Sequence, residues 1–117
     1  MQYMILIYGN ETDAPCPTSE EEGLAMMKPW MDYTDAMKEA GVLVSGEALQ
    51  PTPTATTVRV RGGETMHTDG PFAETKEQLG GYYLIECADL DEALKWAARC
   101  PGAIDGACEV RPVVKFD

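Results

Sequence analysis

The chain has 117 residues, of which 20 are acidic and 9 are basic, so its formal net charge is −11. This length predicts one domain with enough buried surface to fold without disulfide bridges, and a hydrophobic fraction of 44% excludes a disordered chain. The acidity and the absence of a cluster of basic side chains argue against binding to nucleic acid or to an anionic membrane.

The N-terminal third predicts a strand followed by a helix. Residues 3–8 are apolar at every position, which is typical of a strand covered on both faces. A capping box then predicts the start of a helix, and it is formed either by Ser19 with Glu22 or by Thr18 with Glu21. Apolar residues recur at helical spacing after this cap, so we expect one face of the helix to pack on a core.

Glycine and proline mark the end of this helix and the strand after it. Gly41 is well placed as a left-handed terminator of the helix. Pro29 lies inside the helix and predicts a kink or a short break near residue 28. Residues 42–49 then predict a strand, in which Gly46 marks a bulge or a close backbone approach.

The next segments predict a hairpin and a central strand. Residues 56–61 alternate with the period of two that is typical of a half-buried strand. Gly62 and Gly63 predict a two-residue turn, and residues 64–68 form the returning strand. Residues 82–85 are apolar at every position, so they predict a second strand that is buried on both faces.

The last predicted elements are a helix and an edge strand. Asp89 and Glu92 form a second capping box, and an apolar stripe follows it until Pro101 ends the helix. Residues 110–114 predict the final strand, where Pro112 favours the edge of a sheet or a bulge.

The order β-α-β-β-β-β-α-β predicts an α+β protein with a ferredoxin-like fold and an extra hairpin, in which residues 1–117 form one domain. Such a sheet carries its helices on one face only. Because residues 3–8 and 82–85 are apolar on both faces, the second face also needs a cover, and a second copy of the chain is the simplest one. We therefore expect a homodimer that packs sheet against sheet.

One segment carries a resemblance to a known family. Residues 69–77, here called the acidic segment, read DGPFAETKE, and residues 80–83 read GGYY. They resemble the signature of the DGPF group of YCII-related proteins. The similarity extends over nearly the whole chain, through YMILIYG at the start, AGVLV, GE and TTVR in the middle, and EVRP near the end.

This resemblance implies a dimeric α+β barrel. It implies no settled activity, because the DGPF members are largely of unknown function, although relatives with this barrel include small cofactor-free enzymes. Other YCII-related proteins carry a histidine on the first helix as a proposed catalytic partner. Here that helix has no histidine, and Trp30 lies near the equivalent position.

The acidic segment is the main candidate for a catalytic site. Gly70 and Pro71 constrain its backbone, so the segment can aim polar groups into a cavity. If the segment enters a barrel, Asp69 is partly desolvated, which a general base near neutral pH requires, and Lys76 can assist it. The alternative is a turn in which Asp69 caps nearby amide groups and the other side chains are solvated.

His67 is the only histidine and lies two residues before Asp69. In an extended strand both side chains point to the same face, where they could form an acid/base pair. The alternative is an exposed histidine without a catalytic role. One histidine and scattered carboxylates have no recognisable metal-ligand spacing, so no metal site is predicted.

Four further residues are candidates for substrate binding, because the pocket of a barrel combines aromatic walls with a few polar groups. Glu47 interrupts an otherwise apolar strand, and Tyr82 lies on the central strand. Phe72 and Glu74 belong to the acidic segment. For Tyr82 the alternative is packing in the core with a satisfied hydroxyl group.

Three functions from different classes remain open. The first is a cofactor-free enzyme, such as a lyase or an isomerase, that transfers a proton on a small organic molecule with Asp69 as base and Lys76 or His67 assisting. The second is an accessory module that binds a small ligand without chemistry. The third is a dimer that contacts a protein partner through Glu74 and Glu77. Because no nucleotide, serine-hydrolase or zinc-protease motif occurs, no cofactor is predicted.

The four cysteines form no C-x-x-C pair. The apolar run of residues 3–8 has no basic region before it and is too short for a signal or membrane-spanning segment, so we expect a cytoplasmic protein. Because that compartment is reducing, free thiols are the default, with a bridge between Cys100 and Cys108 as the less favoured alternative.

Overall fold

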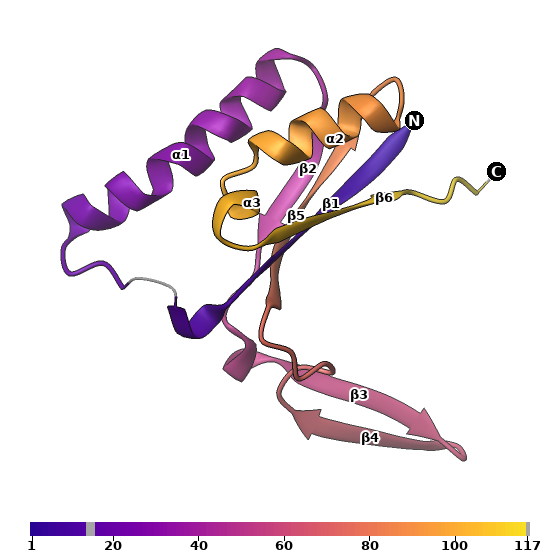
Figure 1. The fold of residues 1–117 in the computed structure, drawn as a ribbon. Helices are drawn as coiled ribbons and strands as arrows, with labels where there is room; N and C mark the ends of the chain where they lie inside the picture. The colour runs from indigo at the N-terminus through magenta and orange to yellow at the C-terminus, as the bar shows by residue number, and fades with distance from the viewer. Residues whose placement is uncertain (14–15, 117) are drawn as a thin grey trace.

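A four-stranded antiparallel sheet forms the body of the protein, and two long helices pack on one of its faces (Figure 1). The structure is a computed structural model that describes residues 1–13 and 16–116. The strands of this sheet, in spatial order, are β2 (Leu43–Ala48), β5 (Gln78–Glu86), β1 (Gln2–Gly9) and β6 (Ala107–Pro112). The helices are α1 (Glu20–Glu39), α2 (Leu90–Arg99) and the short α3 (Gly102–Asp105).

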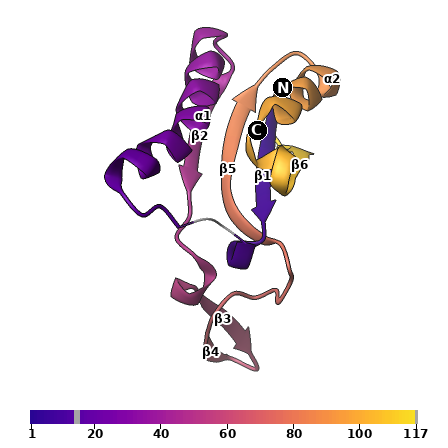
Figure 2. The same ribbon diagram turned by 60° about the vertical axis from the view of Figure 1, so that its left-hand side comes forward.

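The chain order confirms the predicted ferredoxin-like α+β fold, because α1 connects β1 to β2 and α2 leads from β5 to β6. The extra hairpin is also present. It consists of β3 (Thr56–Arg61) and β4 (Glu64–Asp69), which form a separate two-stranded sheet. We call these two strands and their turn the arm, since they project away from the body of the protein (Figures 1 and 2).

The first helix begins and ends at the residues that the sequence predicts. The hydroxyl group of Ser19 accepts a hydrogen bond from the amide of Glu22 at 3.1 Å, while the carboxylate of Glu22 accepts one from the Thr18 hydroxyl at 2.6 Å. At the other end Gly41 has a φ of 73°, which lets the chain turn out of the helix.

Pro29 does not break α1, so the expected short break is absent, while the alternative of a kink near residue 28 stays a prediction. Proline removes one hydrogen bond from the helix, but Pro29 itself is exposed, and the following turns carry Trp30, Tyr33 and Met37 into the core. Because these buried contacts hold the second half of the helix against the sheet, α1 continues through Pro29 to its predicted end.

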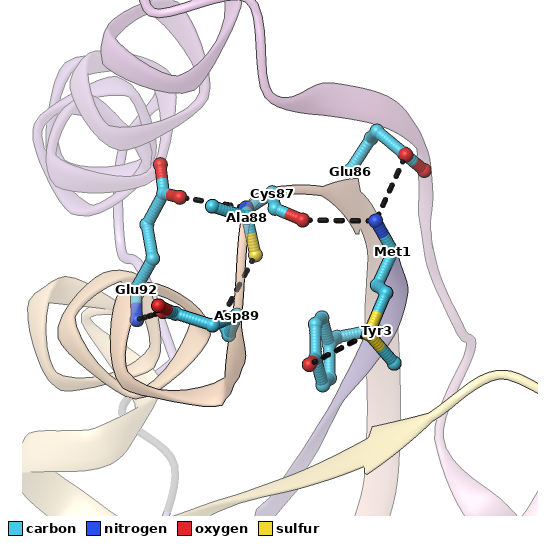
Figure 3. Close-up of polar contacts among 7 residues, drawn as sticks. All are labelled: Met1, Tyr3, Glu86, Cys87, Ala88, Asp89 and Glu92. Atoms are coloured by element: carbon cyan, nitrogen blue, oxygen red, sulfur yellow. Dashed lines mark hydrogen bonds and ion pairs between the residues drawn. The ribbon is translucent and has the colours of Figure 1, made fainter.

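The start of α2 is fastened to the end of β5 by a reciprocal cap (Figure 3). The carboxylate of Asp89 accepts a hydrogen bond from the amide of Glu92 at 2.9 Å, and the carboxylate of Glu92 accepts one from the amide of Ala88 at 2.8 Å. Beside this cap, the amino group of Met1 donates to the carbonyl of Cys87 at 3.0 Å. These bonds join the ends of β1 and β5 to the second helix.

The core lies between the sheet and the two helices. Ile5 on β1 and Ile85 on β5 are fully buried there, together with Met37 of α1 and Ala93 of α2. Side chains of the other parity point to the opposite face of the sheet. Its central residues, here called the open face, are Met4, Leu6, Tyr82 and Leu84. They are only partly buried, and no helix in the described part of the chain packs on them.

Gly46 lies next to a β-bulge and is closely approached by the side chain of Tyr83, in line with the predicted bulge or close approach. The register between β2 and β5 shifts between Leu43 and Ser45, and a Cβ atom on Gly46 would lie 2.6 Å from Cδ1 of Tyr83. The Tyr83 ring cannot move aside, because its hydroxyl group is hydrogen-bonded to the Thr34 hydroxyl at 2.9 Å. A glycine is therefore required beneath this ring.

The arm is less buried than its alternating sequence predicts. Gly62 and Gly63 form the expected turn with φ values of 58° and 81°, and the two strands pair over six positions from Thr56 with Asp69 to Arg61 with Glu64. However, the side chains of both strands are exposed, apart from Thr57, which is half-buried. The prediction of a half-buried strand is wrong for the single chain, because the arm extends beyond the sheet.

Several short elements have no clear signal in the sequence. They are α3, the turn η1 (Glu11–Asp13) and the turn η2 (Thr52–Thr54). The last strand also begins three residues earlier than predicted, because Ala107 and Cys108 pair with Tyr8 and Ile7 of β1. These features depend on partners that are distant in the sequence.

Candidate functional site

An open, mostly apolar cleft lies where the arm joins the body of the protein. Its volume is about 340 Å³. The walls come from the end of β2, from η2, from the acidic segment and from the start of β5. They include Leu49, Thr52, Ala55, Pro71, Gln78 and Leu79.

The beginning of the acidic segment is held at this cleft by its backbone. The amide of Gly70 donates to the carbonyl of Ala55 at 2.7 Å, and the hydroxyl group of Thr57 donates to the carbonyl of Gly70 at 2.8 Å. Gly70 has a φ of 100°, a conformation that side-chain-bearing residues rarely adopt. The motif glycine therefore turns the chain from the arm into the cleft wall, where Pro71 and Ala55 lie.

The rest of the acidic segment is ordered by local hydrogen bonds rather than by burial. The side-chain amide of Gln78 donates to the carbonyl of Ala73 at 3.2 Å and to that of Thr75 at 2.8 Å. The Thr75 hydroxyl donates to the carbonyl of Glu77 at 2.5 Å. Such a loop holds its shape while its side chains remain exposed.

The three predicted catalytic residues are all exposed in the single chain. Asp69 ends β4 opposite Thr56, and His67 lies opposite Val58. Because they are two residues apart on one strand, both side chains are on the same face of the arm, as predicted. Lys76 is exposed in the acidic segment. One chain alone does not desolvate Asp69.

The predicted binding residues fall into two groups. Glu47 on β2 pairs directly with Tyr82 on β5, so the structure brings these two to neighbouring positions on the open face of the sheet. In the acidic segment, Phe72 is 73% exposed, and the guanidinium group of Arg59 lies 4.8 Å from the centre of its ring. Glu74 is also exposed. The two groups therefore belong to different sheets.

Sequence reasoning missed Glu11 as a residue of this region. Its carboxylate accepts hydrogen bonds from the Thr52 amide at 3.0 Å and from the Thr52 hydroxyl at 2.7 Å. Thr52 lines the cleft, so Glu11 fixes one cleft wall to the end of β1. No local pattern reveals this contact, because 41 residues separate the partners.

A second cluster of ionisable groups lies in the core on the helix face of the sheet. The thiol of Cys108 and the backbone amides of Gly102 and Ala103 lie close to the sulfur of Cys100 and stabilise its thiolate form. They lower the pKa of Cys100, although burial opposes them, whereas the neighbouring Cys100 and burial raise the pKa of Cys108. All four cysteines are free thiols, so the alternative of a bridge is not present.

Neither a membrane-spanning helix nor a metal-ligand cluster occurs in the part of the chain that the structure describes. None of the helices in residues 1–13 and 16–116 is long and apolar enough to cross a membrane. The same residues contain no group of three or more His, Cys, Asp or Glu side chains that could hold a metal ion.

Comparison with known proteins gives matches over the full length. The family model described as the YCII-related domain matches residues 1–117. The chain is also similar to an uncharacterised protein of Rhizobium meliloti (strain 1021), with 43% identity over 118 residues that cover 99% of this chain and 94% of that protein. Both matches include the sheet, the helices, the arm and the acidic segment.

Proposed function

The chain belongs to the YCII-related domain family, and we propose that it is a cofactor-free enzyme that transfers a proton on a small organic molecule, with Asp69 as the general base. The proposal rests on one observation: the backbone bond from Gly70 to Ala55, at 2.7 Å, holds the acidic segment at the wall of the apolar cleft. In this proposal the cleft takes the apolar part of the substrate, and Lys76 or His67 assists the base.

The test is hydrogen–deuterium exchange on candidate substrates. Small carbonyl compounds with acidic C–H bonds are incubated with the protein in D₂O, and NMR measures the loss of each C–H signal. We expect faster exchange of at least one compound than in buffer, and a rate reduced about 100-fold by Asp69→Asn. The matched control is Asp91→Asn on the exposed surface of α2, which should exchange at the wild-type rate. Equal exchange by wild type and Asp69→Asn would reject Asp69 as the base.

A small-ligand binding module without chemistry is the second candidate function. It is favoured by the chemistry of the cleft, because none of the side chains that line it is ionisable. Native mass spectrometry of the purified protein distinguishes the two. A ligand that wild type and Asp69→Asn both retain, and that neither converts, favours the binding module.

We also propose that the protein works as a homodimer in the cytoplasm. A reducing compartment is consistent with its four free thiols. A dimer is supported by the shape of the chain, whose radius of gyration is 16.4 Å, whereas a compact domain of this length has about 13 Å. In the proposed dimer the second copy covers the open face of the sheet.

Substitution on the open face tests this dimer. Leu6→Asp places a charge among Met4, Tyr82 and Leu84, so it should shift the protein to monomer in analytical ultracentrifugation. Leu94→Asp on α2 is the matched control, because Leu94 is 47% exposed on the helix side. A wild-type protein that remains monomeric at every accessible concentration would contradict the dimer.

A further inference from the structure

We infer that the two copies of the dimer exchange their arms. The face of each arm that carries Val58 docks on the other copy, and this contact buries His67 and Asp69, which lie on the same face. The inference rests on the proposed dimer and adds the surface that holds it together. It also makes each candidate site a composite of two chains.

The arm has no core of its own. Val58 and Val60 are each 58% exposed, although both lie in the middle of a strand. An isolated two-stranded hairpin is marginally stable in water, and packing of one face against another surface is what normally stabilises it. The full pairing of β3 with β4 therefore points to a surface that the single chain does not supply.

The two faces of the arm differ in chemistry. One face carries Arg59, Arg61 and Glu64, and Phe72 already lies against Arg59. The other face, here called the docking face, places Val58 opposite His67 and Val60 opposite Thr65, with Asp69 and Thr56 at its base. Docking through this face buries two valines and one carboxylate, whereas docking through the first face would bury three charged side chains, so the docking face is the one suited to an interface.

The exposed surface of the chain points to a second copy as the partner of the docking face. The accessible surface of the chain is 8553 Å², whereas a compact monomer of this mass exposes about 6,300 Å². The excess of about 2,300 Å² is larger than the ~800 Å² that each partner contributes to a standard stable interface. A symmetric dimer uses such surface twice, because each chain both gives and receives an arm.

Charge supports the same occupant and the same face. Each copy carries a net charge of −11, so two copies repel each other wherever acidic surfaces meet. Residues 56–69 contain two arginines and two carboxylates, which makes the arm neutral within an acidic chain when His67 is uncharged. The arm is thus a part of the surface that can approach another copy with little repulsion. Docking there also removes water from Asp69, as a general base requires.

A pair of aspartate substitutions on opposite faces of the arm tests the inference. Val58→Asp puts a charge on the docking face and should raise the dimer dissociation constant at least tenfold in analytical ultracentrifugation. Met66→Asp makes the same kind of change on the other face of the same hairpin and should alter the constant less than about threefold. Equal dissociation constants for wild type and Val58→Asp would overturn the inference.

A measurement on the unmodified protein guards against misfolded variants. Amide hydrogen exchange of residues 56–69 should be slow in the dimer and fast after dilution to monomer, because docking protects the arm. Arm amides that exchange equally fast in both states would overturn the inference. If Leu6→Asp dissociates the dimer while the arm stays unprotected, the dimer stands and only the arm inference fails. A wild-type monomer at all concentrations would remove both.

Discussion

At the scale of single residues, the aromatic side chains of the core are held by neighbours on several elements at once. The hydroxyl groups of Tyr83 on β5 and Thr34 on α1 are hydrogen-bonded to each other. The ring of Tyr83 also meets the ring of Tyr33 edge-on, with 5.5 Å between the ring centres. Tyr33 in turn donates to the carbonyl of Trp96 on α2 at 2.7 Å. These contacts join both helices to the sheet, so small changes beside them should have measurable effects.

Gly46→Ala should destabilise the protein. Its new Cβ would lie 2.6 Å from the trapped ring of Tyr83, and such overpacking costs about 1–3 kcal/mol. Gly9→Ala is the matched control, because a Cβ there would meet no other residue within 4 Å and should cost far less. Urea unfolding of the two variants gives the comparison, and equal midpoints would contradict the close approach.

Ionisation of the Tyr33 hydroxyl group should lower the free energy of unfolding at alkaline pH. Burial, reinforced by the nearby thiols of Cys100 and Cys108, raises the pKa of Tyr33 above its ordinary value of 10.0. Above about pH 10 the unfolded chain loses this proton while the folded chain keeps it, so the free energy of unfolding falls as pH rises.

Urea unfolding of Tyr33→Phe on both sides of pH 10 tests this dependence. The variant should lose about 1 kcal/mol at neutral pH, because its bond to the Trp96 carbonyl is gone, but its stability should fall less steeply in alkali. If wild type and variant have parallel pH profiles, the titration of Tyr33 does not control the alkaline loss.

At the scale of elements, the helices follow from local chemistry. Ser19 and Asp89 cap α1 and α2 by accepting the amides of Glu22 and Glu92, each three residues later. Both caps are readable in the sequence, because donor and acceptor lie within one turn. By contrast, Thr52 of η2 is hydrogen-bonded to Glu11, which lies 41 residues earlier in the chain, and no local rule predicts this contact.

Asp89→Ala should remove the cap of α2 and cost about 1 kcal/mol. For a domain of this size, that loss lowers the melting temperature by about 4 °C. Asp35→Ala in the exposed middle of α1 provides the control, and it should change stability by less than about 0.5 kcal/mol. Circular dichroism measures the melting temperatures of both variants. A lower value for Asp89→Ala alone indicates loss of the cap, whereas equal values for the two variants indicate a general effect of losing one carboxylate.

At the scale of the whole molecule, the single chain is flat and open, with extents of 48 × 48 × 20 Å. Its arm lies outside the body, and its sheet keeps one apolar face without a helix in the described residues. A chain of this shape has little core for its length, since its fully buried large side chains are Ile5, Met37, Ile85 and Cys100. Association is the physical means of completing such a core.

The melting temperature should therefore rise with protein concentration. When unfolding is coupled to dissociation, mass action favours the folded dimer at high concentration. Differential scanning calorimetry over a wide concentration range measures this, with Leu6→Asp as a variant whose melting temperature should be independent of concentration. A concentration-independent wild type would contradict coupling between folding and assembly.

Local patterns in the sequence were enough to predict the order of the elements, the helix caps, the turn at Gly62 and Gly63 and the ferredoxin-like connection. Each of these depends on residues within a few positions, or on a simple period of two or 3.6. The acidic segment was also sufficient to find the family, which the full-length match confirms. Exposure of the arm was not predictable, because alternation within a strand does not say whether a covering layer exists.

The grouping of the candidate residues depended on the packing of distant segments. This packing placed Glu47 beside Tyr82 on the sheet, kept His67 and Asp69 together on the arm, and brought Cys100 and Cys108 together at the core. The physical reason is that burial and side-chain proximity come from contacts between segments far apart in the chain. Local spacing limits which contacts can form, but the packing of whole elements selects among them.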